Sequence, residues 1–122
     1  MILRRSLQDG VVVLCVEGTD ALDTACAAAF KHAAVEAIPD GGDVVVDLGG
    51  LDFVDSAGVG AFVGLYKAAR ARGARLRFAG ARPGVRSVLE LIRLHRILEI
   101  SDEVAGAARE LRERRRTDPG ID

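Results

Sequence analysis

The chain alternates short runs of β-branched residues with longer segments in which apolar residues recur at helical spacing. Residues 11–16 (VVVLCV) and 43–48 (DVVVDL) are apolar and largely without alternation, which is typical of strands buried on both faces of a sheet. Between them, residues 23–38 combine strong helix formers with large apolar residues on one face, and they end at Pro39. The first half of the chain therefore predicts a strand, a helix and a second strand.

The second half continues this alternation. Residues 59–72 carry apolar residues at helical spacing, and Gly73 follows as a helix-ending residue. Residues 74–80 (ARLRFAG) alternate leucine and phenylalanine with Arg75 and Arg77, which predicts a strand with one wetter face.

Three further elements are expected toward the C-terminus. A helix begins near Pro83, a short strand covers residues 96–100 (RILEI), and a charged helix extends from residue 101 to about residue 115. The arginine run 114–116 follows acidic residues in that helix. We interpret it as a solvated helix face and not as a nucleic-acid patch.

The N-terminal segment 1–7 precedes Asp9-Gly10, a strong signal for a tight turn, and is expected to pair antiparallel with the next strand. The remaining strands alternate with helices, so they must be largely parallel. We expect a single α/β domain over residues 1–116, with a mixed, mostly parallel sheet of four to five strands, about four helices and an antiparallel N-terminal edge. Residues 117–122 are expected to form a frayed C-terminal tail.

Charge and composition exclude several classes of function. The chain of 122 residues suffices for one domain, and its 17 basic and 18 acidic residues give a formal net charge of -1. No charge excess would draw it to nucleic acid or to an anionic membrane. No apolar run reaches the roughly 18 to 20 residues that span a bilayer, and no signal peptide is recognisable. We therefore expect a soluble, cytoplasmic protein that does not insert into a membrane.

The cysteines and histidines give no sign of a metal centre. Cys15 and Cys26 lack CxxC spacing, and His32 and His95 stand alone in the sequence. We interpret both thiols as small buried side chains in a reducing compartment. No metal ligand is predicted.

Residues 51–62 (LDFVDSAGVGAF) interrupt the most hydrophobic region with small and polar residues. Ser56 lies where a strand is followed by a helix, and either Ser56 or Asp55 can cap that helix. Gly58 and Gly60 each cost about 1 kcal/mol relative to alanine inside a helix, so their bare backbone suggests close approach by a neighbouring loop or a partner. A phosphate on Ser56 would be tolerated, because free amides and the helix dipole favour negative charge there.

The stretch from residue 44 to residue 100 resembles the STAS domain, and most closely its stand-alone bacterial members, the anti-sigma factor antagonists. The shared features include the signature Asp55-Ser56-x-Gly58 and a following helix, strand and helix. The resemblance implies a STAS-like fold for the whole domain.

The resemblance also implies a phosphorylation switch. Unmodified antagonists bind an anti-sigma factor, often a serine kinase, and so release a sigma factor for transcription. The kinase phosphorylates the serine that matches Ser56, and a phosphatase reverses the change. The phosphate adds about -1.5 to -2 charges beside Asp55, which would repel a surface that meets a neutral hydroxyl. The expected partner-binding residues are Asp20, Asp23, Asp55, Ser56, Ala57, Gly58 and Gly60.

Two departures from the family pattern affect this surface. Family members carry a Gly-x-Leu-Asp turn where this chain reads EGTDALDTA, so Asp20 or Asp23 would be the equivalent aspartate. Either aspartate could instead cap the helix that follows. The second departure is Ile92-Arg93, where the family commonly has a small hydroxyl residue and a glycine. Because a left-handed arginine would cost on the order of 1 kcal/mol, we expect that helix to end differently.

Other functions remain as alternatives. STAS domains also act as cytoplasmic regulatory subunits of membrane transporters, including lipid-transport ATPases, where no phosphorylation is required. A small nucleotide hydrolase has little support, because the chain has no GxxxxGK[ST] phosphate loop and no recognisable Ser/His/Asp set. Asp47, Asp52 and Asp55 are interpreted as strand-end and turn residues. We therefore predict a regulatory protein that is not an enzyme and needs no cofactor, and the sequence leaves a homodimer open.

Overall fold

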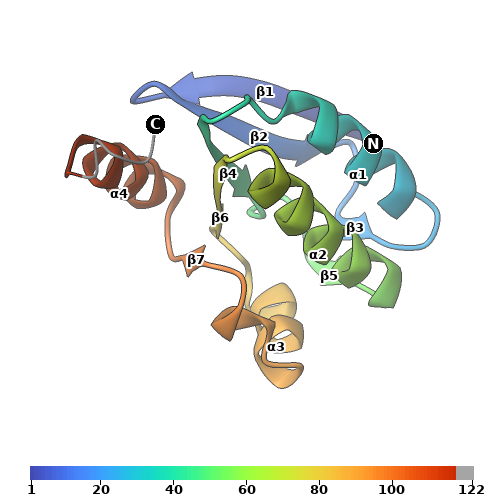
Figure 1. The fold of residues 1–122 in the computed structure, drawn as a ribbon. Helices are drawn as coiled ribbons and strands as arrows, with labels where there is room; N and C mark the ends of the chain where they lie inside the picture. The colour runs from blue at the N-terminus through green and yellow to red at the C-terminus, as the bar shows by residue number, and fades with distance from the viewer. Residues whose placement is uncertain (118–122) are drawn as a thin grey trace.

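The computed structural model describes residues 1–117 as an α/β domain built on a five-stranded sheet (Figure 1). The sheet has the order β1-β2-β4-β6-β7, in which only β1 and β2 pair antiparallel. These strands are β1 (Ile2–Gln8), β2 (Val11–Glu17), β4 (Asp43–Asp47), β6 (Arg75–Ala79) and β7 (Ile100–Ser101). The predicted fold class, with its antiparallel N-terminal edge, is confirmed.

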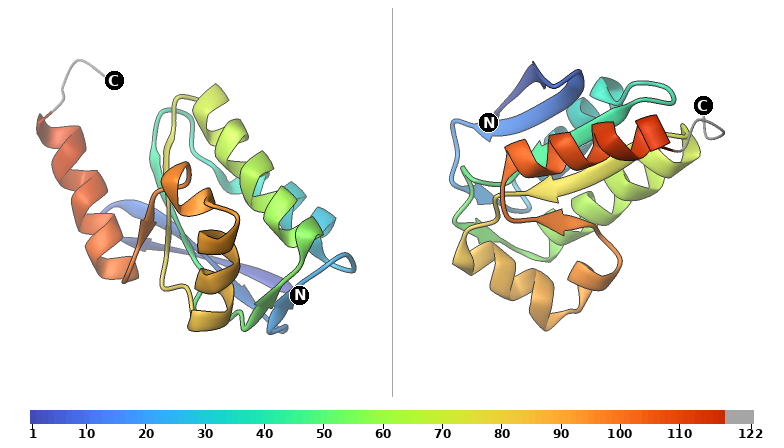
Figure 2. Two further views of the ribbon diagram at one scale, coloured as in Figure 1. Left: turned by 90° about the horizontal axis from the view of Figure 1, so that it is seen from below. Right: turned by 90° about the vertical axis from the view of Figure 1, so that its left-hand side faces the viewer.

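Four α-helices connect or follow these strands within residues 1–117. They are α1 (Ala27–Ala37), α2 (Ser56–Ala71), α3 (Pro83–Leu91) and α4 (Val104–Thr117), and a short 3₁₀ helix, η1 (Leu94–Arg96), follows α3. The parallel strands follow one another in one direction across the sheet, so right-handed crossovers place α1, α2 and α3 on the same face. Figure 2 shows α4 on the opposite face. Thr117 is the last described residue, and positions 118–122 of the predicted tail lie outside the described residues.

The two faces of the sheet have cores of very different size. Under α1, α2 and α3, three aromatic rings form the centre: Phe62 stands edge-on to Phe30 at 6.0 Å and tilted against Phe78 at 5.1 Å between ring centroids. Under α4, the core consists of small residues, namely Val11, Val13, Val45, Ala79, Ala107, Ala108 and Leu111. Both faces of β2 and β4 are therefore covered, as their uninterrupted apolar runs predict.

A second, two-stranded parallel sheet was not predicted. β3 (Ala21–Leu22) pairs with β5 (Phe53–Val54), and β5 leads directly into α2. Main-chain bonds extend this pairing, because the carbonyl of Asp20 accepts from the N–H groups of Asp52 and Phe53 at 2.7 and 3.2 Å. The small sheet therefore fixes the position at which α2 begins.

Three expectations about the second half are wrong. The segment 96–100 is not a strand: residues 94–96 form η1, and β7 contains only Ile100 and Ser101. Arg77 does not face solvent but is 8% exposed, because α4 covers that face of β6. Arg93 does adopt the left-handed conformation, with φ 61° and ψ 23°, at a strain of about 1 kcal/mol.

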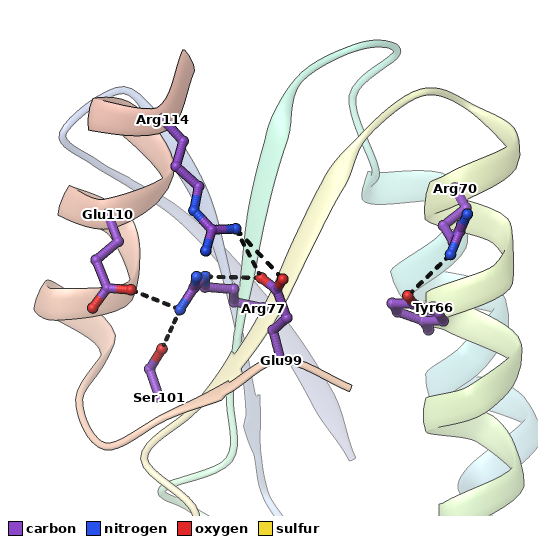
Figure 3. A network of polar contacts seen from close by, with 7 residues as sticks. All are labelled: Tyr66, Arg70, Arg77, Glu99, Ser101, Glu110 and Arg114. Carbon is purple, nitrogen blue, oxygen red and sulfur yellow. Dashed lines mark hydrogen bonds and ion pairs between the residues drawn. The ribbon is translucent and has the colours of Figure 1, made fainter. Parts of the chain in front are cut away.

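Ion pairs fasten α4 to the sheet (Figure 3). The Arg77 guanidinium lies 2.7 Å from a Glu110 oxygen and donates to the Ser101 hydroxyl at 3.0 Å. At the other end of α4, Arg115 donates to both carboxylate oxygens of Asp43 at 2.9 Å. Within the C-terminal arginine run, Arg115 thus contacts the domain and is not merely solvated.

Within residues 1–117, no helix is both long enough and apolar enough to cross a bilayer.

Candidate functional site

Ser56 is the first residue of α2 and is exposed. The N-cap position belongs to Asp55, whose Oδ1 accepts a hydrogen bond from the N–H of Gly58 at 3.0 Å. Of the two capping assignments that the sequence allows, the structure selects Asp55. The Ser56 hydroxyl makes no hydrogen bond to any other residue in the described part of the chain. Its oxygen is therefore available for chemistry.

Asp55 also ties α2 to the turn before α1. Its second oxygen, Oδ2, accepts from the main-chain N–H and the hydroxyl of Thr24, each at 3.1 Å. The hydrogen bond from Gly58, followed by those from Thr24, lowers the pKa of Asp55 below its ordinary value, because each donor stabilises the carboxylate. Asp55 therefore holds a permanent negative charge beside Ser56 at neutral pH.

The structure separates the two candidate aspartates of the preceding loop. Asp23 closes the turn before α1: its Oδ1 accepts from the N–H of Ala25 at 3.0 Å. It directly precedes Thr24 and so lies beside the Asp55 contact. Asp20 is exposed and contributes its main-chain carbonyl to the small sheet. Neither aspartate occupies the N-cap of α1, which is Cys26.

Gly58 and Gly60 differ sharply in their surroundings. A Cβ on Gly58 would collide with the carbonyl oxygen of Leu22 and with the Val54 side chain. The close approach expected for this glycine is therefore that of the neighbouring small sheet. Gly60 is exposed, and a Cβ there would meet no atom within 4 Å. Nothing inside the described chain requires a glycine at position 60.

Ala57 is half-buried, so the exposed part of the first turn of α2 consists of Ser56 and Gly60. These two positions lie one helical turn apart and therefore share a face. The surface they form has no bulky side chain of its own. At Gly60 no Cβ separates an approaching partner from the helix backbone.

Two residues of this region were missed by the sequence analysis. Phe53, in β5, is 53% exposed although it is a large apolar residue. Thr24 holds Asp55 from 31 residues away. No feature of the sequence marks Phe53 as exposed, and a contact across 31 residues leaves no local pattern in the sequence.

The charges near Ser56 are mainly acidic. Asp20, Asp23 and Asp55 lie in the segments that meet at the start of α2, and Asp52 precedes β5, where it pairs with Arg82 at 2.6 Å. The opposing positive contribution comes from the free amides and dipole of α2. Among residues 1–117, no group of three or more His, Cys, Asp or Glu side chains is placed to hold a metal ion. Ser56 therefore lies between acidic side chains and the positive end of the α2 dipole.

Comparison with known proteins gives consistent matches over almost the whole chain. The family model described as STAS domain matches residues 3–107. An anti-sigma factor antagonist from Thermotoga maritima superposes with a TM-score of 0.77 at 25% identity, covering 90% of this chain and 94% of that one.

Two further structures share the fold at lower identity. SpoIIAA of Bacillus, a cell fate determinant solved in its phosphorylated form, matches with a TM-score of 0.62 and 22% identity, over 88% of this chain and 98% of that one. A sulfate transporter family protein from Wolinella succinogenes matches with a TM-score of 0.69 and 16% identity, over 84% and 85% of the two chains. The fold is thus shared with anti-sigma factor antagonists and with a sulfate transporter family protein.

Proposed function

The chain belongs to the STAS domain family, and we propose that it is a cytoplasmic anti-sigma factor antagonist controlled by phosphorylation of Ser56. In its unmodified form it binds an anti-sigma factor serine kinase and so frees a sigma factor for transcription. The kinase releases itself by phosphorylating Ser56, and a phosphatase restores binding.

The observation that carries this proposal is the free Ser56 hydroxyl. It is exposed at the first position of α2, while the neighbouring Asp55 performs the capping. A serine needed only as a cap would have its oxygen bonded to a first-turn amide. The Ser56 oxygen makes no such hydrogen bond, so a phosphate can be added there without loss of a structural hydrogen bond.

The same geometry accounts for a switch without a change of fold. A phosphate adds about -1.5 to -2 charges at neutral pH. The free amides of α2 offset part of that charge, so the helix remains stable. A docked partner would instead meet a bulky dianion beside the carboxylate of Asp55. Binding is lost because the surface changes charge and shape, while the domain stays folded.

The proposed partner surface consists of the first turn of α2 and the loop that contacts it. Gly60 leaves the helix backbone bare next to Ser56, and Phe53 adds an exposed apolar side chain. Asp23, beside Thr24, is the better placed of the two loop aspartates to meet a kinase. The proposed surface residues are Asp20, Asp23, Phe53, Asp55, Ser56, Ala57 and Gly60. Gly58, expected from the sequence to bind the partner, is buried against Leu22 and Val54 and only shapes the turn beneath this surface.

A binding experiment with substitutions at Ser56 tests the proposal. We expect Ser56→Ala to bind the kinase partner as tightly as the wild type, since the hydroxyl is lost without added charge. Ser56→Asp is expected to weaken binding by about tenfold or more, because like charges then face each other at a docked surface. Ser87→Ala, an exposed serine within α3, is the matched control. Equal binding by wild type, Ser56→Ala and Ser56→Asp would rule out the switch.

The structural match to a sulfate transporter family protein favours one second candidate, a regulatory domain that binds a transporter subunit without phosphorylation. Co-purification distinguishes the two. A small soluble serine kinase as partner supports control of a sigma factor. An ATPase subunit of a membrane transporter supports the second candidate.

A further inference from the structure

A cavity of about 380 Å³ lies at the opposite end of α2 from Ser56. Tyr66 and Arg70 of α2 line one side of it, and the other side is lined by Glu99, in the segment before β7, and by Arg114 of α4 (Figure 3). Its size falls within the range of small-molecule sites. Arg70 is fourteen residues beyond Ser56, which corresponds to about 21 Å along the helix. This cavity is therefore separate from the surface proposed for the partner.

The cavity exists because β7 is short. β7 pairs only with Phe78 and Ala79, so the edge of β6 near Leu76 has no neighbouring strand. The N–H groups of Phe78 and Gly80 point to this edge and bond to the carbonyls of residues 99 and 101. By the alternation of a strand, the N–H and C=O of Leu76 point the same way. The N–H of Leu76 has no hydrogen-bond acceptor within residues 1–117.

The rim of the cavity is cationic. Its lining includes the guanidinium groups of Arg70, Arg75 and Arg114 and the carboxylate of Glu99, and Arg75 and Arg114 have further interactions of their own. Arg70 lies against the Tyr66 ring at 5.8 Å and donates to its hydroxyl at 3.3 Å. Within the described chain no carboxylate pairs with Arg70. Its positive charge is held over the cavity without being neutralised.

Glu99 does not cancel this charge. It lies 3.4 Å from Arg114 and 3.2 Å from the Nε of the buried Arg77, so it is shared between two cations. The Arg114 pair is half-exposed and therefore weak.

The floor of the cavity is apolar. Ala74, Leu76 and Leu111 line it, and each is nearly fully buried. The Tyr66 ring, which is only partly buried, adds apolar surface beside this floor, and an acyl or aryl group would cover that surface where a bare inorganic ion would not. The combination of an apolar floor and a donor-rich cationic rim defines the chemical class of the ligand.

We propose that this cavity binds a small organic anion, in which a carboxylate or phosphate headgroup meets Arg70 and Arg114 and an acyl or aryl body packs against the Tyr66 ring above the apolar floor. The neighbouring cavity of about 440 Å³ does not share these properties. Asp102, Glu103 and Glu110 line it, and its one arginine, Arg77, already lies 2.7 Å from Glu110. The assignment therefore concerns the Arg70 cavity alone and does not depend on Ser56.

Titration of the full chain with four eight-carbon probes tests this assignment. Octanoate and octyl phosphate carry the two headgroups, octan-1-ol is the neutral analogue and octylamine the cationic one. We expect at least one anionic probe to bind saturably, with NMR amide shifts centred on residues 66–70 and 74–76, and octanol and octylamine to bind more weakly by about tenfold or more. Which anion binds more tightly identifies the headgroup.

Two variants connect binding to the rim. Arg70→Gln is expected to weaken binding of the anionic probe by about tenfold, because the substitution removes one charge-assisted hydrogen bond. Lys67→Gln, an exposed cation on the same helix outside the cavity, is expected to leave affinity unchanged. Thermal unfolding checks that both variants fold. If Arg70→Gln does not fold, Arg114→Gln takes its place. Absence of saturable anion binding, equal binding of octanol, or insensitivity to the rim arginines would overturn the proposal.

Discussion

At its first turn, α2 is crowded from below by the small sheet and capped by Asp55, so that main-chain contacts decide its geometry. At its last turns, the same helix borders an open cavity, whose wall is formed there by the side chains of Tyr66 and Arg70. The first end offers a helix dipole and a bare hydroxyl, which suit a covalent change of charge. The second end offers guanidinium groups, which suit reversible binding of an anion. One helix thus carries two sites that use different chemistry and tolerate different substitutions.

The largest expected effect on stability lies at the crowded end. Gly58→Ala is expected to destabilise the chain by about 2 kcal/mol, because the added Cβ would collide with the Leu22 carbonyl and overpack the contact. Chemical denaturation of wild type and variant measures the difference. A neutral effect would show that the contact between α2 and the small sheet is loose.

A smaller loss is expected from Asp55→Asn, and it should depend on pH. The pKa of Asp55 is lowered by Gly58 and Thr24, so its carboxylate stabilises the folded chain above the unfolded pKa, and this contribution disappears as the pH falls through the folded value. The stability difference between wild type and Asp55→Asn should therefore shrink in acid. Denaturation at several pH values measures it, with the exposed Asp40→Asn as control. A difference that grew as the pH fell would contradict the assigned hydrogen bonds.

The opposite sign is expected at Gly60, two residues beyond Gly58 in α2. Gly60→Ala meets open space and should stabilise the free chain by up to about 1 kcal/mol, since alanine favours the helix. If the partner approaches the bare backbone beside Ser56, the same variant should bind it less tightly. Unfolding and affinity measured on one preparation separate the two effects. Unchanged affinity would remove Gly60 from the partner surface.

The smallest stability effect is expected at the open end. Arg70→Gln should change stability by no more than about 0.5 kcal/mol, because it loses an exposed cation–π contact and a favourable charge in the last turn. Chemical denaturation of Arg70→Gln and Gly58→Ala under the same conditions compares their free energies of unfolding. A loss as large as that of Gly58→Ala would mean that Arg70 is structural and that the two ends of α2 do not differ as described.

Much of the fold follows from local sequence patterns. The apolar runs of β2 and β4 and the spacing of apolar residues in α2 and α3 each point to one structure, and the structure has them. The small sheet escaped prediction because two-residue strands show no periodicity. Arg77 was predicted to face solvent but is buried, because α4, which covers it, comes more than 25 residues later in the chain.

The candidate site was predicted only in part, because only part of it depends on a local sequence pattern. The Asp55-Ser56-x-Gly58 signature is local, so it located the start of α2 correctly. It could not decide between Asp55 and Ser56 as the cap, because both have a suitable side chain. Thr24 and the role of Gly58 depend on segments that meet only in the folded chain.

The central claim is that Ser56 is the residue that a partner kinase modifies, and mass spectrometry tests it most directly. The purified chain is incubated with ATP and each serine kinase of its own genome that binds it, and the phosphorylated positions are then located. The account predicts phosphate on Ser56 in wild type and in Ser87→Ala, and none in Ser56→Ala. Phosphate at another serine, or an unmodified Ser56 in the presence of an active kinase that binds the chain, would contradict it.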